Sequence, residues 1–81
     1  MASVEGGVIM VLTMGEKIKI VMKRRGLTIA QLAEMTGQTR QNLSNKLVRD
    51  NFTEKEINEL AGALNCEYDA FLTMRDTGDK I

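Results

Sequence analysis

Residues 27–47 read LTIAQLAEMTGQTRQNLSNKL, and this stretch decides how the chain folds. Two short helical patterns lie on either side of Gly37, whose missing Cβ permits the left-handed backbone that a sharp turn requires. Thr28 can cap the first helix while Gln31 returns the hydrogen bond, and Thr39 can cap the second. The stretch therefore predicts two helices that meet at a glycine turn.

Helical patterns flank this stretch on both sides. Upstream, apolar residues recur at helical spacing over Gly15–Arg25, and Gly26 follows as a stop signal. Downstream, Thr53 and Glu56 can form a second capping box ahead of an apolar stripe, and a short fifth helix is expected over 67–72. The stripe consists of Ile57, Leu60, Ala61 and Leu64. The predicted fold class is therefore all-α, with five helices.

Eighty-one residues are enough for one domain. We expect that domain over residues 14–72, a polar tail over residues 73–81, and a flexible arm or short strand over residues 1–13. The arm contains the apolar run Val8–Leu12, which has no helical period and is typical of a strand. A disordered tail is the alternative for this segment, as is a natural start at one of the later methionines.

The charges divide the chain into two halves, although the net charge is zero. Residues 14–49 hold eight cations and two carboxylates, whereas residues 50–81 hold three cations and eight carboxylates. A chain of this kind can present one basic surface to a polyanion and an acidic surface behind it. Chance clustering is the alternative interpretation.

The helix after Thr39 has an unusual outward side. With Leu43 and Leu47 inward, a rotation of about 100° per residue places Gln41 and Asn45 outward. A surface helix governed by propensity favours Glu, Lys and Ala over such amides. Amides can donate and accept together, which matches the N6 and N7 atoms of adenine in the major groove of DNA. An ordinary solvated face is the alternative.

Cations at both ends of this helix also point to DNA. Arg40 lies in the first turn, where a cation opposes the helix dipole unless an anion or a guanine accepts its hydrogen bonds. We expect base contacts from Arg40, Gln41, Asn42 and Asn45. We expect phosphate contacts from Thr28, Thr39, Ser44, Lys46 and Arg49.

The sequence resembles the Cro/repressor (XRE, lambda-repressor-like) family of helix-turn-helix proteins over about residues 14–72. The residues that carry the resemblance are Leu27-Thr28, Gln31-Leu32-Ala33, Thr36-Gly37 and Arg40-Gln41-Asn42-Leu43-Ser44-Asn45. The resemblance implies a five-helix lambda-repressor-like domain of bacterial or phage type that binds double-stranded operator DNA as a homodimer. It also implies that Arg40, Gln41 and Asn45 stand at base edges.

Three positions depart from the family pattern. Ile29 stands where a Gln usually touches phosphate, and Lys46 stands where an apolar or aromatic residue is usual. In this family a glycine usually follows the helix that begins after Thr39, but residues 48–51 contain no glycine. None of these changes removes the outward amides.

Two functions are compatible with these residues. The first is a sequence-specific DNA-binding transcriptional regulator, a repressor, that dimerises. The second is a protein-interaction module, such as an antitoxin or accessory regulator, for which Ile29, Val48 and the acidic residues after Thr53 could form a surface.

Other classes of function are not expected. The chain has no histidine and no metal-spaced cluster, and its lone Cys66 has no sequence partner to activate it, so we predict no enzyme activity. We likewise expect no cofactor and no small-molecule ligand. No apolar run approaches the length of a membrane span, which with the unpaired cysteine predicts a soluble cytoplasmic protein.

Overall fold

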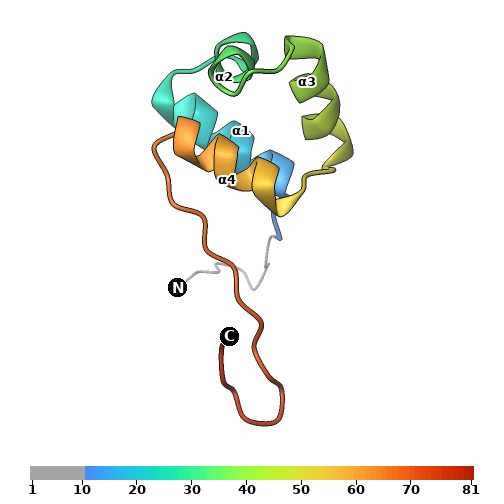
Figure 1. The fold of residues 1–81 in the computed structure, drawn as a ribbon, viewed down its shortest axis with the longest axis vertical. Helices are drawn as coiled ribbons and strands as arrows, with labels where there is room; N and C mark the ends of the chain where they lie inside the picture. Colours follow the sequence, from blue (N-terminus) through green and yellow to red (C-terminus); the bar gives the residue numbers. More distant parts are fainter. Residues whose placement is uncertain (1–10) are drawn as a thin grey trace, which may run out of the picture.

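The computed structural model describes residues 11–81 as a helical body with a C-terminal extension (Figure 1). The described part contains four α-helices and no strand longer than an isolated bridge. They are α1 (Met14–Arg25), α2 (Ile29–Met35), α3 (Arg40–Arg49) and α4 (Glu54–Ala63). The all-α prediction is confirmed. None of these helices is long and apolar enough to cross a membrane.

Every helix begins at a threonine whose hydroxyl accepts a hydrogen bond from the backbone three residues later. The predicted capping boxes at Thr28 and Thr53 are both confirmed, and a third box joins Thr13 to Glu16 at the start of α1. Thr39 caps α3 without a reciprocal side chain. These caps satisfy backbone donors that a helix leaves unpaired at its first turn, so they fix where each helix begins.

One hydrophobic core lies among the four helices. Leu32, Leu43 and Leu60, from α2, α3 and α4, are the largest side chains that are fully buried. Burial of a leucine side chain contributes about 1.5–3 kcal/mol, so these three residues account for much of the attachment of α2 and α3 to the body. The remaining core residues are Ile18, Met22, Ala33, Leu47 and Leu64.

A close contact joins the start of α1 to the end of α3. The backbone N–H of Gly15 donates to Asp50 Oδ1 at 2.7 Å. A Cβ at Gly15 would lie 2.7 Å from the carbonyl oxygen of Leu47, closer than two such atoms can approach. Asp50 has the left-handed φ of 55° and ends α3 where the family pattern has a glycine. The contact therefore sets how closely α3 lies against α1.

The fifth helix predicted over 67–72 does not form. Asn65 ends α4 in the left-handed conformation (φ 58°), and the N–H of Cys66 closes the turn on the carbonyl of Ala61 at 2.7 Å. From there the chain is extended. Tyr68, Phe71 and Leu72 stand at helical spacing, but apolar residues also recur at every second position, as they do in a strand. The alternating apolar positions are Cys66, Tyr68, Ala70, Leu72 and Met74.

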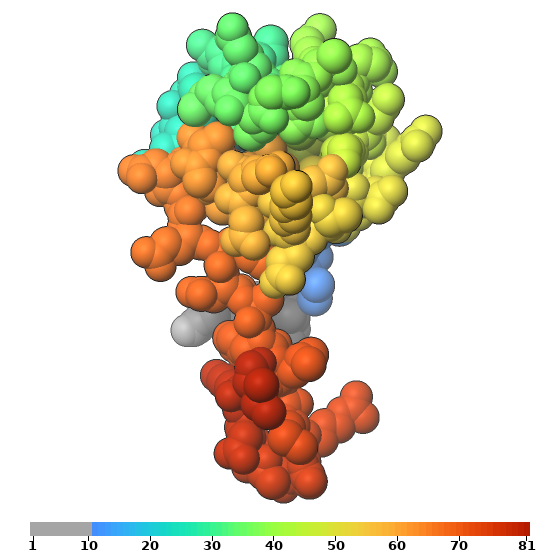
Figure 2. All heavy atoms as spheres, viewed as in Figure 1, coloured from blue at the N-terminus to red at the C-terminus, as the bar shows by residue number. Residues whose placement is uncertain are grey.

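Residues 66–81, here called the C-terminal arm, fold back on themselves. Leu72 and Ile81 exchange two backbone hydrogen bonds of 2.8 Å, and the N–H of Met74 donates to the carbonyl of Asp79 at 2.8 Å. The predicted polar tail is thus a short hairpin, which projects from the helical body (Figure 2). The predicted N-terminal arm lies largely outside the described residues, and 11–13 have no regular structure.

Candidate nucleic-acid interface

The turn between α2 and α3 is built from short-range contacts. Gly37 has the left-handed φ of 70°, and the N–H of Gln38 donates to the carbonyl of Ala33 at 2.9 Å. The hydroxyl of Thr36 donates to the carbonyl of Leu32 at 2.9 Å. The predicted glycine turn is confirmed, and it leaves α3 at the surface with its inner side on the core.

The outward side of α3 carries a pair of hydrogen-bonded amides. Gln41 Nε2 donates to Asn45 Oδ1 at 3.1 Å, and both side chains are exposed. Arg40 and Ser44 lie beside them and line a shallow hollow together with Gln41. Gln41 keeps one N–H donor and its Oε1 acceptor for another molecule, and Asn45 keeps both N–H donors. This is a polar surface whose donors and acceptors are already oriented.

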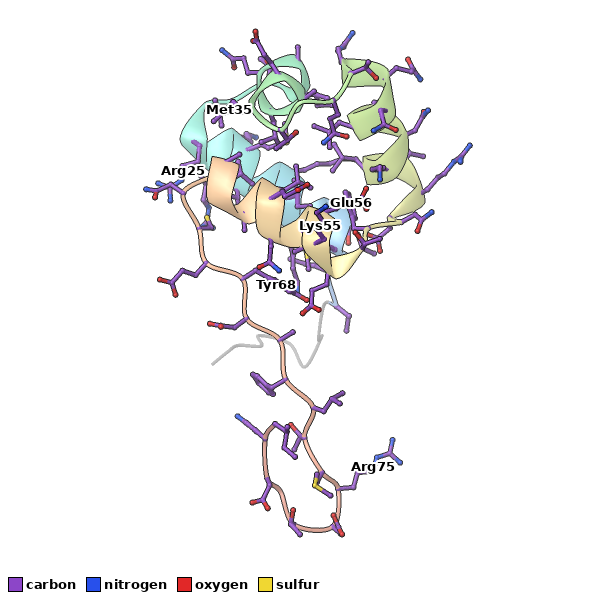
Figure 3. The ribbon with its side chains drawn as sticks, viewed as in Figure 1. Arg25, Met35, Lys55, Glu56, Tyr68 and Arg75 are labelled. Carbon is purple, nitrogen blue, oxygen red and sulfur yellow. The ribbon has the colours of Figure 1, made fainter. Side chains whose placement is uncertain are left out.

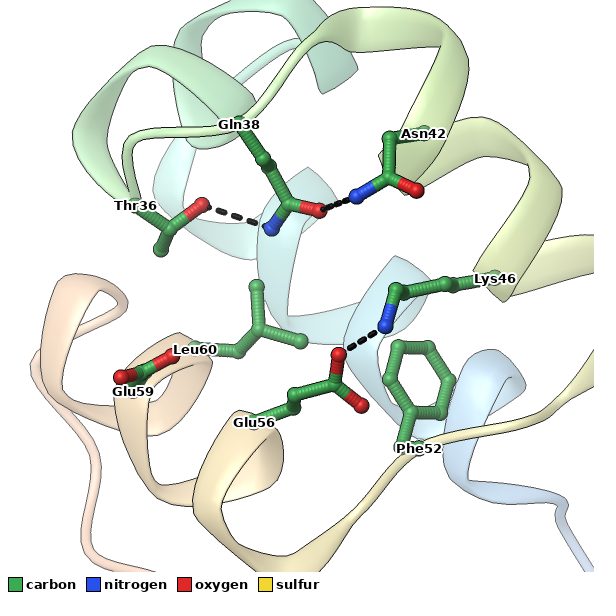
Figure 4. Close-up of a pocket in the computed structure, with 8 residues that line it drawn as sticks. All are labelled: Thr36, Gln38, Asn42, Lys46, Phe52, Glu56, Glu59 and Leu60. Carbon is green, nitrogen blue, oxygen red and sulfur yellow. Dashed lines mark hydrogen bonds and ion pairs between the residues drawn. The ribbon is translucent and has the colours of Figure 1, made fainter.

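Asn42 belongs to a different set of contacts. Its Nδ2 donates to Gln38 Oε1 at 2.9 Å, and Gln38 Nε2 donates in turn to the hydroxyl of Thr36 at 2.9 Å (Figure 4). This chain of three side chains ties the first turn of α3 to the end of α2. Asn42 remains exposed and retains its Oδ1 acceptor, so it can both hold the turn and contact a ligand.

Lys46 forms an ion pair within the protein. Its ammonium bonds to Glu56 Oε2 on α4, beside Phe52 (Figure 4). The other oxygen of Glu56, Oε1, accepts the N–H of Thr53 at 2.8 Å and so completes the cap of α4. Lys46 thus lies on the inner flank of α3, at the position where the family pattern has an apolar residue, and Glu56 provides the charge partner there.

The exposed cations of α3 are Arg40 and Arg49, neither of which forms an ion pair among residues 11–81. Other cations of the basic half lie elsewhere. Arg25 donates from Nε and Nη2 to the carbonyls of Leu64 and Asn65, at 3.0 and 3.2 Å. Lys17 lines a cleft formed by α1, α4 and the first residues of the C-terminal arm. The positive charge of residues 14–49 is therefore spread over more than one side of the body.

Thr28, Thr39 and Ser44 are the hydroxyl residues that the sequence predicts at phosphates. Thr28 and Thr39 are exposed N-caps, each of which accepts a backbone hydrogen bond and keeps its own hydroxyl donor. Ser44 is partly buried on the flank of the amide pair. The starts of α2 and α3 both also carry backbone N–H groups at the positive end of a helix dipole.

Three residues that shape this surface were not singled out by sequence reasoning: Gly15, Gln38 and Asp50. Glu56 was expected in the cap at Thr53, but its ion pair with Lys46 was not. Gly15 and Asp50 act through one contact with each other, which spans 35 positions of the sequence. Gln38 gave one local indication, because it lies four residues before Asn42, a spacing at which two amides can meet across a helix start.

Comparison with known proteins gives one match. Residues 17–75 match the family model described as the Cro/C1-type HTH DNA-binding domain. The matched range includes the capped starts of α2, α3 and α4, the turn between α2 and α3, and the amide pair. No curated protein and no solved structure matches the chain.

Proposed function

The chain belongs to the Cro/C1-type helix-turn-helix DNA-binding family, and we propose that it is a sequence-specific transcriptional regulator, a repressor, that reads the major groove with α3. The single observation that carries the proposal is the exposed pair of hydrogen-bonded amides, Gln41 and Asn45, on the outward side of α3. A helix face with oriented donors and acceptors suits base edges, which present donors and acceptors at fixed positions.

Each base-reading residue has a chemical role in this proposal. Gln41 accepts from adenine N6 through Oε1 and donates to N7 through its remaining N–H. Asn45 holds the Gln41 amide in place and offers its own two N–H donors to a neighbouring acceptor. Arg40, at the tip of α3, binds guanine O6 and N7 or a phosphate, and Asn42 contacts the edge of the site.

Phosphate contacts come from the flanks of the amide pair. Thr28, Thr39 and Ser44 donate hydroxyls, and Arg49 supplies a cation that has no ion-pair partner in the described structure. Lys46 also belongs to the proposed set, but its charge is balanced by Glu56. A balanced cation releases fewer counterions from DNA, so Lys46 contributes less than Arg49 to the salt dependence of binding.

The proposed ligand is double-stranded operator DNA in the cytoplasm, bound by a homodimer. One α3 reads a half-site of a few base pairs, and two copies related by a two-fold axis read a symmetric site with half-sites about one helical turn apart. Dimerisation thus raises both affinity and specificity.

Selection of bound sequences from random duplex DNA, at two salt concentrations, tests the proposal. We expect enrichment of a symmetric site and binding that weakens steeply with salt. The matched control for Gln41→Ala is Asn58→Ala, which removes an exposed amide from α4. We expect Gln41→Ala alone to lower discrimination at one base pair by about 1–3 kcal/mol. Equal loss for all sequences would show that Gln41 does not read a base.

A second candidate function is supported by two exposed apolar side chains, one at the end of α2 and one near the end of α3. Met35 at the end of α2 and Val48 on α3 are 54% and 78% exposed. A surface of this kind suits an antitoxin or accessory regulator that binds a protein. Binding of a defined protein partner that survives nuclease treatment, together with no enriched DNA site, would favour this function over the first.

A further inference from the structure

The C-terminal arm exposes apolar side chains that nothing in the described structure covers. Leu72 and Ile81 are 77% and 78% exposed, and Phe71 and Met74 are also exposed. An isolated two-stranded hairpin is at best marginally stable in water. An arm of this composition is therefore suited to packing against another molecule.

Most of the apolar side chains share one face of the hairpin. Leu72 and Ile81 exchange both backbone hydrogen bonds, so their side chains lie on the same side. Because side chains alternate along a strand, Ala70 and Met74 lie on that side too. The opposite side carries Phe71, whose ring lies 4.7 Å from the ammonium of Lys80. The two faces of the arm are thus chemically different.

One edge of the hairpin is open. The N–H and C=O of Leu72 point toward Ile81, so the same groups of Phe71 and Thr73 point toward the opposite edge. On that edge, the backbone groups of residues 67, 69, 71 and 73 make no backbone hydrogen bond within the described part of the chain. An exposed edge of this kind is a template for pairing with another strand.

We propose that this edge pairs antiparallel with the same edge of a second copy, so that two arms form one intermolecular sheet. The inference rests on the proposed function, in which two copies of α3 read one symmetric DNA site. The pairing is centred on Phe71, whose backbone groups point across the edge. In this register the paired edge runs from Glu67 to Arg75, the residue at which the chain begins to turn.

The sequence of the arm is self-complementary in this register. Glu67 lies opposite the partner's Arg75, which gives two ion pairs related by symmetry. On the apolar face, Ala70 lies opposite the partner's Leu72, and Tyr68 lies opposite the partner's Met74. In Figure 3 the side chain of Arg75 projects away from the hairpin, where it is accessible to a partner.

Charge favours a second copy over residues 8–12, the other segment whose sequence predicts a strand. Residues 8–12, of which 8–10 lie outside the described part, carry no charged side chain. Pairing with them would leave Glu67 and Arg75 without partners. The arm also extends from the side of the body away from α2 and α3, so pairing leaves the amide pair of α3 accessible (Figure 1).

Sedimentation equilibrium of the full chain without DNA tests this proposal. We expect a reversible dimer that Leu72→Lys weakens by about tenfold or more in Kd, a change of about 1.4 kcal/mol. The matched control is Val48→Lys, since Val48 on α3 is as exposed as Leu72, and we expect it to dimerise like the unaltered chain. Helical circular dichroism verifies that both variants keep the body folded.

A charge exchange tests the register. Glu67→Arg and Arg75→Glu should each raise Kd, because each places like charges opposite one another, and the double variant should restore dimerisation. A double variant that dimerises no better than either single variant overturns the pairing centred on Phe71.

Two further outcomes overturn the proposal. The first is an unaltered chain that stays monomeric up to millimolar concentration, which would leave the chain's own residues 8–12 or an unlike protein as the occupant. The second is equal dimerisation of Leu72→Lys and Val48→Lys. If the arm variants dissociate the dimer but no DNA site is enriched, the proposed function fails and this inference stands. If instead the chain binds operator DNA as a monomer, the proposed DNA reading stands and this inference fails.

Discussion

The helical body and the C-terminal arm are held in place by different kinds of interaction. In the body, α2 and α3 are attached through fully buried side chains such as Leu32 and Leu43. The arm is attached through Cys66, which packs against the core, and Arg25 bonds to the two carbonyls just before it, whereas its apolar side chains beyond Ala70 face solvent. The body is therefore held by a buried core, whereas the arm beyond Ala70 is held by the backbone hydrogen bonds of its own hairpin.

Leu43 in the core and Leu72 in the arm are expected to differ in how much they stabilise the protein. Leu43→Ala should lower the free energy of unfolding by about 2–5 kcal/mol, because it leaves a cavity in the core. Leu72→Ala should change it by less than about 0.5 kcal/mol at a concentration where the protein is monomeric, because the side chain is exposed. Urea denaturation measures both. A large loss for Leu72→Ala in the monomer would show that the arm belongs to the core.

Gly15 gives the next largest expected effect. In Gly15→Ala the new Cβ meets the carbonyl oxygen of Leu47, so α1 and α3 must move apart, at a cost of about 1–3 kcal/mol. The matched control is Gly62→Ala on α4, where a Cβ meets no atom within 4 Å and alanine favours the helix. Thermal unfolding of the two variants should shift in opposite directions, and equal shifts would contradict the proposed contact.

Arg25 tests the attachment of the arm. In Arg25→Met the carbonyls of Leu64 and Asn65 lose a charged donor, which should weaken the end of α4 by about 1 kcal/mol. Hydrogen exchange of the Cys66 amide, which bonds to Ala61, should accelerate while that of core amides stays unchanged. Acceleration throughout the body would show instead that Arg25 supports the whole fold.

The smallest effect is expected at the ion pair of α3. Lys46→Met should change the free energy of unfolding by less than about 1 kcal/mol, because the pair is partly exposed and methionine suits the flank beside Phe52. If DNA binding is established, its salt dependence should fall more for Arg49→Met than for Lys46→Met, since Glu56 already balances Lys46. Equal changes would show that Lys46 leaves Glu56 when DNA binds.

The sequence was most informative where contacts are local. The capping boxes at Thr28 and Thr53 and the turn at Gly37 depend on neighbours within a few residues, and all three are confirmed. The amide pair on α3 follows from helical spacing alone, although its hydrogen bond does not. Whether these amides read bases stays a prediction.

Contacts between distant residues could not be predicted in this way. The partner of Lys46 lies ten residues further on, on another helix, so its ammonium was expected at phosphate. The helix expected over 67–72 was wrong because the apolar residues that suggested it also fit a strand, and the alternation from Cys66 to Met74 identifies the strand only when the whole arm is considered. The contact between Gly15 and Asp50 has no sequence pattern at all.

The bond between Gln41 and Asn45 bears on how this surface could change during evolution. A side chain that is already held loses less conformational entropy on binding, a saving of about 0.5–1.5 kcal/mol. Replacing Asn45 removes that restraint from Gln41 as well as the contacts of Asn45 itself. A new binding preference therefore requires change at both positions. A variant that carries only one of the two mutations is expected to be a weakly binding intermediate.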